Sequence, residues 1–378
     1  MKKNKNMRKK EFLICFICII AISLTACEKN ISDKKADNSN YNTTSKNTDR
    51  IKMNIDDFVQ IDATVDVPES LKKLRMNKVK AHRPKLNINE LKKIFFSKNK
   101  IKKKEIEKEY KSREFGKYNI IDYYGSDDEY LCCEISDCYF ANPLLDYYLN
   151  CMNTLPEYNE YNMNKYSLTD TLSFASRNEI FKKIKAVYET IGVPISEEYE
   201  AYALDYNTLS KEENPVDVND TIREDWKKEN WTKKDDAYYF VLYQEIGGVP
   251  IRQIQYGDGY QGIGIEETVL EAIYGARGWI SFRERWGYQL EDTKEKVNIL
   301  SVEEILKSLQ KKCSMLTTKE KWKIDDISME LIPIFIKDND YEIHPVWSLK
   351  GTTEDIDGNQ FDLEIIFDGI TGKEVILQ

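Results

Sequence analysis

Histidine is almost absent from this chain, with only His82 and His344 among 378 residues. Because histidine supplies many zinc ligands and most acid–base groups that act near neutral pH, this scarcity excludes His-rich metal sites and most His-based catalysis. The sequence also has no Gly-x-Ser-x-Gly elbow, no His-Glu-x-x-His zinc motif and no Walker loop. We therefore expect no catalytic residue, no metal site and no cofactor. His344 precedes Pro345 and is predicted to lie at a turn or a strand start.

The first 26 residues combine a basic start, the apolar run 12–22 and small residues before Cys27. This order is typical of a signal peptide, and the apolar run is shorter than the about 20 residues of a transmembrane helix. Leu24-Thr25-Ala26-Cys27 resembles the lipobox of bacterial lipoproteins, in which the cysteine receives a diacylglyceryl group and becomes the mature N-terminus. The resemblance implies that Cys27 anchors the chain to the outer face of a Gram-positive-type cytoplasmic membrane.

The segment after Cys27 is rich in Asn, Ser, Lys, Asp and Thr. Such a composition buries too little apolar surface to order itself, and it predicts a disordered stalk over residues 27–50. The net charge is −9, and removal of residues 1–26, with six basic residues and one acidic residue, leaves −14. An acidic chain disfavours nucleic acid and anionic lipid headgroups as partners.

Five cysteines lie beyond the lipobox, namely Cys132, Cys133, Cys138, Cys151 and Cys313. Outside the cytoplasm an odd number of cysteines cannot all pair within one chain. This group contains no Cys-x-x-Cys pair and has no histidine nearby, so we expect no structural zinc. One disulfide or small buried thiols remain as the alternatives, and the sequence does not identify the pair.

Three segments carry the signature of a helix start, with a cap residue, a glutamate and an apolar stripe: Asn87–Leu91, Ser176–Ile180 and Ser301–Ile305. The second helix is expected to stop at Gly192, before Pro194. The Lys-rich run 98–111 is interleaved with glutamates and predicts a solvated helix.

Short apolar or alternating runs predict strands at 237–243, 269–274, 279–286, 327–336, 346–349, 361–367 and 374–377. The predicted fold class is α+β, with antiparallel sheets and a few packed helices. The length beyond the stalk suggests two domains. We place an N-terminal α+β domain at 51–220 and a C-terminal one at 221–378, divided in a polar stretch.

The C-terminal half ends with three short motifs, Leu331-Ile332-Pro333, His344-Pro345-Val346-Trp347 and Phe367-Asp368-Gly369-Ile370-Thr371-Gly372. Together with a preceding strand and helix, they resemble the PepSY-like and YycH/YycI-like extracytoplasmic proteins of Firmicutes. Those proteins usually have alanine before the Thr-Gly motif, where this chain has Asp368-Gly369. The resemblance implies a non-catalytic module that binds or regulates a protein at the cell surface. The N-terminal half resembles uncharacterised lipoproteins of gut Firmicutes and adds no activity.

Three weaker patterns in the sequence fit loops, turns and sheets better than binding sites. Gly257–Gly262 matches Gly-x-Gly-x-x-Gly, but strand-like sequence follows it, so a loop is expected and no nucleotide. The acidic groups Asp127-Asp128-Glu129, Asp235-Asp236 and Asp338-Asn339-Asp340 lack the spacing of a calcium loop and are expected to be solvated turns. The many tyrosines either stack on sugars or, more often, fill sheets.

Two further classes of function are weighed against a surface binding protein. A solute-binding lipoprotein of a transporter fits the length and the anchor, although the C-terminal half lacks an alternating β-α pattern. An envelope hydrolase depends on the acidic groups, whose distances in space the sequence does not give. Our first hypothesis is therefore a membrane-tethered, non-catalytic lipoprotein that acts on an envelope protein partner.

Overall fold

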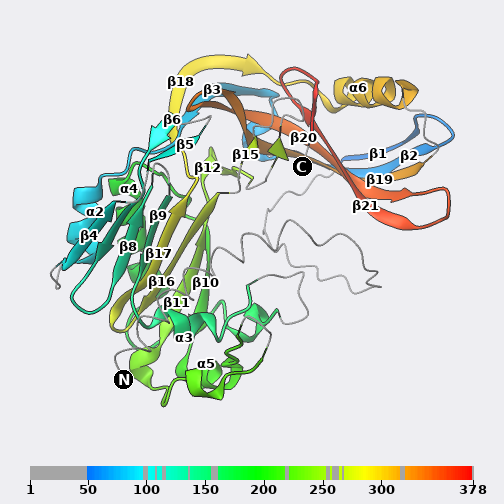
Figure 1. The fold of residues 1–378 in the computed structure, drawn as a ribbon. Helices are drawn as coiled ribbons and strands as arrows, with labels where there is room; N and C mark the ends of the chain where they lie inside the picture. The colour runs from blue at the N-terminus through cyan, green and yellow to red at the C-terminus, as the bar shows by residue number, and fades with distance from the viewer. Residues whose placement is uncertain are drawn as a thin grey trace. The chain divides into compact units, whose positions relative to one another are not determined.

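The computed structural model describes residues 49–96, 101–106, 109–112, 116–134, 137–154, 161–217, 221–252, 256–257, 264–265, 268–315 and 320–376. The chain divides into two compact units, Ser45–Glu213 with Lys228–Gln378 and Met1–Thr44 with Asn214–Lys227. The larger unit consists mostly of antiparallel sheet with a few helices, which confirms the predicted α+β class (Figure 1).

In the smaller unit, the described residues between Asn214 and Lys227 form a tight local structure. Val216 makes an isolated antiparallel bridge with Ile222. The 3₁₀ helix η3 (Glu224–Trp226) follows, and the Arg223 guanidinium lies 4.5 Å from the centre of the Trp226 ring. These contacts join residues that are close in sequence.

Sheet A is the first of two eight-stranded sheets in the larger unit. Its strands are β1 (Asp49–Asn54), β2 (Val59–Asp66), β3 (Arg75–His82), β18 (Gln289–Asn298), β19 (Lys321–Lys337), β20 (Asp340–Glu354), β21 (Gln360–Asp368) and β22 (Glu374–Val375). They are ordered β1-β2-β19-β20-β21-β22, and β3 pairs with both β18 and β20. Only the pairing of β2 with β19 is parallel among the described strands of this sheet.

Sheet B is ordered β10-β11-β16-β17-β9-β8-β7-β4, and all its described pairings are antiparallel. Its strands are β4 (Lys103–Ile106), β7 (Ile121–Tyr124), β8 (Tyr130–Cys133), β9 (Asp137–Ala141), β10 (Tyr199–Leu204), β11 (Ala237–Leu242), β16 (Val269–Gly275) and β17 (Gly278–Arg285). Both large sheets therefore combine strands from before and after residue 220.

The remaining elements are short hairpins and helices. The hairpins are β5 (Tyr110–Ser112) with β6 (Gly116–Tyr118), β12 (Glu245–Ile246) with β13 (Val249–Pro250), and β14 (Tyr256–Gly257) with β15 (Gly264–Ile265). The helices are η1 (Glu69–Leu71), α2 (Ile88–Phe95), α3 (Leu145–Leu149), η2 (Met163–Lys165), α4 (Arg177–Thr190), α5 (Tyr206–Glu212), η4 (Lys233–Asp235) and α6 (Val302–Met315).

The three helix starts predicted from the sequence are confirmed by α2, α4 and α6. At α4, the Ser176 hydroxyl accepts from Glu179 N while the Glu179 carboxylate accepts from Ser176 N, so two otherwise unpaired amides are satisfied. Gly192 has φ +76°, a conformation that glycine adopts readily, directly after the cap residue Ile191. These local signals suffice because each involves neighbours in sequence.

The helix predicted for the Lys-rich run 98–111 is wrong where the structure describes it. Residues 103–106 form β4, which pairs with β7 along one edge of sheet B. Lysines are common on edge strands because their charge discourages pairing with another chain. The interleaved charges therefore reflect an edge strand and not a helix surface.

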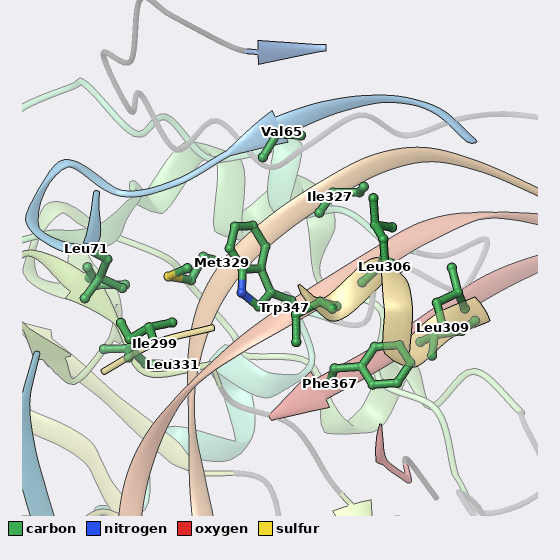
Figure 2. Close-up of a cluster of buried hydrophobic side chains, with 14 of the residues drawn as sticks. Val65, Leu71, Ile299, Leu306, Leu309, Ile327, Met329, Leu331, Trp347 and Phe367 are labelled. Carbon is green, nitrogen blue, oxygen red and sulfur yellow. The ribbon is translucent and has the colours of Figure 1, made fainter. Parts of the chain in front are cut away.

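The core of sheet A lies beneath α6. Trp347 on β20 is 1% exposed and packs among Met329, Leu306 and Phe367, from β19, α6 and β21 (Figure 2). Its indole Nε1 donates to Leu300 O at 2.9 Å, just before the helix begins. Trp347 of β20 therefore contacts α6 and the neighbouring strands β19 and β21.

The core of sheet B lies between its inner face and the helices α2 and α4. Phe140, Phe282 and Phe240 on the strands pack with Phe95 of α2 and Ile184 of α4. Among the residues that the structure describes, a smaller cluster that includes residues of α3 and α5 covers part of the other face. Much of the remaining outer face is half-buried.

Candidate functional site

Strand register places a row of tyrosines and charged residues on the outer face of sheet B. Successive strand residues point to opposite faces, so residues paired across strands share a face. One such row runs through Glu200, Val241, Glu271, Arg283, Tyr139, Cys132 and Asp122. Adjacent rows add Tyr130, Tyr202, Tyr239, Tyr243 and Arg285. We call these residues, without Val241 and Cys132, the tyrosine face.

Tyrosine hydroxyls hold the carboxylates of the tyrosine face. Glu200 accepts from Tyr202 Oη at 2.6 Å and from Tyr243 Oη at 3.2 Å. Glu271 accepts from Tyr239 Oη at 2.8 Å. Burial, reinforced by the hydrogen bond to Glu200, raises the pKa of Tyr202 above its ordinary value, so this hydroxyl stays a donor. The two glutamates are therefore fixed in position by tyrosine hydroxyls of the same face.

Asp122 and Arg285 extend this pattern. The buried Asp122 accepts from Tyr130 Oη at 2.8 Å, and Arg285 Nε lies 3.6 Å from Asp137 Oδ2. The Arg283 guanidinium lies 5.9 Å from the centre of the Tyr139 ring. Most of the face is half-buried, with charged and aromatic groups interleaved. Such a surface offers planar donors, fixed acceptors and flat aromatic area together.

The inner face of sheet B contains one carboxyl group within the apolar core. Glu284 is 0% exposed and lies between Leu270 of β16 and Cys138 of β9. Its Oε1 accepts from Gly287 N at 2.8 Å, while none of the described residues forms a hydrogen bond with Oε2. Burial raises the pKa of Glu284 to about 8. This group is consequently a neutral acid over much of the neutral range.

A charged side chain fills the junction where β17 continues toward β18. The buried Arg83 follows β3 and lies over the rings of Trp286, Tyr288 and Tyr341, at 5.0, 4.2 and 4.8 Å from their centres. Its guanidinium also donates to Trp286 O. Rings on three sides stabilise the cation away from water. We interpret this cluster as a structural link between the two sheets.

On sheet A, the three C-terminal motifs meet on neighbouring strands. Ile332 pairs with His344, and Val346 pairs with Asp368. His344 Nδ1 lies 2.9 Å from Asp368 Oδ2, and both residues are buried. The prediction of a turn or strand-start histidine is wrong, because His344 lies inside β20 and pairs with Ile332 of β19, a pairing that sequence alone does not give.

Asp368 also organises the turn after β21. Its Oδ1 accepts from Ile370 N at 2.7 Å and Thr371 N at 3.1 Å. Burial alone would raise the pKa of Asp368, but the hydrogen bonds from His344 and from these amides hold it below its ordinary value. Gly369 packs closely here, since an added Cβ would lie 2.8 Å from Pro345 O. Alanine at this position would clash with the backbone of Pro345.

A second charged group lies on the same face of sheet A. Arg252 Nη1 lies 2.9 Å from Glu330 Oε2 and 2.7 Å from Glu364 Oε1. Lys350 Nζ lies 3.0 Å from Glu330 Oε1, and Ser348 Oγ donates to Glu364 Oε1 at 2.6 Å. The charges balance within the group, so we interpret it as a structural ion-pair network.

The acidic groups noted in the sequence lie apart and have local roles. Asp235 is buried, where a solvated turn was predicted, because Lys228 and Arg277 pair with it at 3.1 and 3.0 Å. Asp236 accepts from Tyr206 N at 2.9 Å, and Asp340 lies 3.1 Å from His82. Over the described ranges, no three His, Cys, Asp or Glu side chains are grouped to hold a metal ion.

Several sequence predictions fall on other parts of the chain. The lipidation site Cys27, the signal peptide and most of the stalk lie outside the described residues, as does most of the Gly-rich match at 257–262. Residues 49–50 of the expected stalk belong to β1. Among the residues that the structure describes, no helix is long and apolar enough to cross a membrane.

The tyrosine face was missed as a site from the sequence. Its signal was present in the alternation Glu200-Ala-Tyr202 and in Tyr239 of β11, but these also fit ordinary sheet filling. Only the pairing of strands far apart in the chain shows that the polar positions share one face.

Comparisons with known proteins bear on the fold. No family model and no curated protein matches the chain. Among solved structures, it is similar to a crystal structure of an uncharacterized protein from Eubacterium rectale ATCC 33656. The TM-score is 0.53 and the identity is 17%, over 87% of this chain and 94% of that chain. At this identity the similarity shows a shared fold across most of both chains.

Proposed function

We propose that this chain is a membrane-tethered extracellular lipoprotein whose tyrosine face binds an envelope protein partner without catalysis. The observation that carries the proposal is the row of tyrosines, arginines and hydrogen-bonded carboxylates across sheet B. Tyrosine and arginine are enriched among the residues that dominate protein–protein binding energy. A broad sheet face of this composition is suited to binding the surface of another protein.

The internal hydrogen bonds of this face also favour binding. Glu200 and Glu271 are each held by tyrosine hydroxyls, so little side-chain freedom is lost when a partner docks. Groups fixed in advance bind more tightly than groups that must first become ordered. In the unbound protein, both carboxylates already have these tyrosine hydroxyls as hydrogen-bond partners.

The C-terminal half is proposed to be PepSY-like and YycI-like. In support, α6 packs on a sheet whose strands β19, β20 and β21 follow it in the chain as an antiparallel meander. Two of the motifs that carry the resemblance lie inside β19 and β20, and the third spans the end of β21 and the turn that follows it. The proposed role in binding a protein at the cell surface is consistent with this assignment.

Anchoring through Cys27 has a direct test. Cys27→Ala is expected to abolish metabolic labelling with a fatty-acid analogue and to move the protein from the membrane fraction to the medium. Alanine has no thiol to receive the diacylglyceryl group, so neither acyl chain is attached. Cys18→Ala, in the predicted signal peptide, is the matched control and should leave labelling intact. Full labelling of the Cys27→Ala protein would refute the proposed anchor.

Binding through the tyrosine face is tested by capture from membranes of the native host. Arg283→Ala and Tyr139→Ala are each expected to weaken capture of a specific envelope protein at least about tenfold, as interface hot spots do. Binding is measured by titration with the captured partner, after thermal melting has shown that each variant is folded.

Exposed residues elsewhere provide matched controls for this test. Arg50→Ala on β1 and Tyr110→Ala on β5 remove the same side chains at sites away from the tyrosine face. Both controls should retain full binding. Equal binding by the controls and by the two face variants would exclude the tyrosine face as the docking site, even if a partner is found.

A further inference from the structure

Cys133 and Cys138 lie directly opposite each other in the β8–β9 hairpin. They are 1% and 0% exposed, and the adjacent pair closes the turn with a hydrogen bond from Glu134 N to Asp137 O at 2.8 Å. Opposed residues in antiparallel strands have Cα atoms about 4.5–5.5 Å apart. Disulfides span about 4.4–6.8 Å between Cα atoms, so the backbone already has the required spacing.

The side chains of these two cysteines also meet. Both belong to the core between sheet B, α2 and α4, where interaction with the Cys133 thiol and burial raise the pKa of Cys138. The other described cysteines lie elsewhere. Cys132 points to the opposite face beside Tyr130 and Asp122, Cys151 belongs to the α3–α5 cluster, and Cys313 belongs to α6. Geometry therefore singles out one pair among the five cysteines.

We propose that Cys133 and Cys138 form a disulfide when the exported chain folds in the presence of a disulfide oxidant. One cysteine thiolate attacks a small-molecule disulfide or an oxidoreductase disulfide, giving a mixed disulfide and one released thiolate. The second cysteine thiolate then attacks the protein sulfur of the mixed disulfide, forming the Cys133–Cys138 bond and releasing the second thiolate. The two cysteine protons end on the two released thiols, so the cysteines are oxidised and the oxidant is reduced.

Burial determines when this bond forms. In the folded chain neither sulfur is accessible to an external oxidant. The neighbouring Cys133 thiol and burial raise the pKa of Cys138, which disfavours its thiolate. Oxidation must therefore precede closure of the core or accompany its opening. Once formed, the bond is shielded from reducing thiols by the same packing, so it remains after folding.

The test is oxidative refolding of the full mature chain with Cys27→Ser. The unfolded chain is refolded in a mixture of reduced and oxidised glutathione, then denatured in acid and alkylated. We expect three of the five thiols to be modified. Proteolytic cleavage after Glu134 should leave the Cys133 and Cys138 fragments joined until a reductant is added. Refolding without oxidised glutathione should give five modified thiols.

Single substitutions identify the pair. Cys133→Ser and Cys138→Ser should each abolish the linked fragments, whereas Cys132→Ser and Cys151→Ser should retain them. Near-ultraviolet circular dichroism confirms that each variant has refolded. Modification of all five thiols in oxidatively refolded protein, or linkage through Cys132, would overturn the proposal.

Discussion

Glu284→Gln is expected to flatten the pH dependence of the free energy of unfolding. Burial raises the pKa of Glu284 to about 8, against about 4.5 for an exposed glutamate. Between these values the folded protein keeps a proton that the unfolded chain releases, so rising pH favours unfolding. The wild-type protein should lose on the order of 3 kcal/mol between pH 5 and pH 7.5 through this group, and no more above its folded pKa.

Stability falls as the pH rises because the folded protein favours the protonated form of Glu284. The stabilisation is complete below the unfolded pKa and is lost as the pH rises through the folded value. Glutamine keeps an acceptor for Gly287 N but cannot ionise, so its stability should change less over this range. Denaturant unfolding curves between pH 5 and pH 8.5 measure the difference between the two proteins.

A matched control separates burial from loss of charge. Glu291→Gln removes a carboxylate from an exposed position on β18 and should follow the wild-type pH profile. If Glu284→Gln follows the same profile as this control, Glu284 does not carry a proton in the folded state, and its environment is more hydrated than its burial indicates.

Glu284 also shows where sequence reasoning stops. In the sequence it stands between Arg283 and Arg285, inside the strand predicted at 279–286. Strand alternation turns both arginines to the outer face and Glu284 inward, where Leu270 and Cys138 flank it. Whether the inward side is apolar depends on β9 and on α4, which lie far away in the chain. The local pattern therefore could not predict this buried acid.

Helices, in contrast, were predictable from short-range chemistry. The capping box at Ser176 and Glu179 involves residues three apart, and the stop at Gly192 requires only a residue that tolerates positive φ. The strands of the C-terminal half were found for a similar reason, because β19, β20 and β21 are consecutive hairpin partners. The parallel pairing of β2 with β19 joins Val59 to Trp322 and had no local signal.

The same distinction applies to the tyrosine face. Glu200, Glu271 and Tyr139 lie in strands that the chain visits far apart, and their proximity is a consequence of register alone. A shift of one residue in any of these pairings would turn the affected strand's polar groups into the core. The composition shows that tyrosines are numerous, but only the strand pairing in the folded sheet shows which of them share one face.

Trp347→Ala is expected to lower the free energy of unfolding by about 4 kcal/mol, the size typical of a deleted core aromatic. Trp347 is 1% exposed and contacts the side chains beneath α6, so the deletion leaves a cavity between the helix and β19–β21 (Figure 2). It also leaves Leu300 O without its indole donor at the start of the helix. Denaturant unfolding measures the loss, and hydrogen exchange in α6 should show faster local opening.

Two further substitutions make this result interpretable. Trp347→Phe keeps an aromatic ring but removes the indole N–H, so it should cost about 1–2 kcal/mol for the lost hydrogen bond and the smaller ring. Trp226→Ala removes the same side chain at a half-exposed position beside Arg223, and should cost less than about 1 kcal/mol. If Trp347→Ala unfolds at the same denaturant concentration as Trp226→Ala, α6 is not held to sheet A through this residue. If Trp347→Ala does not fold, the graded loss in Trp347→Phe still distinguishes a core position from a surface one.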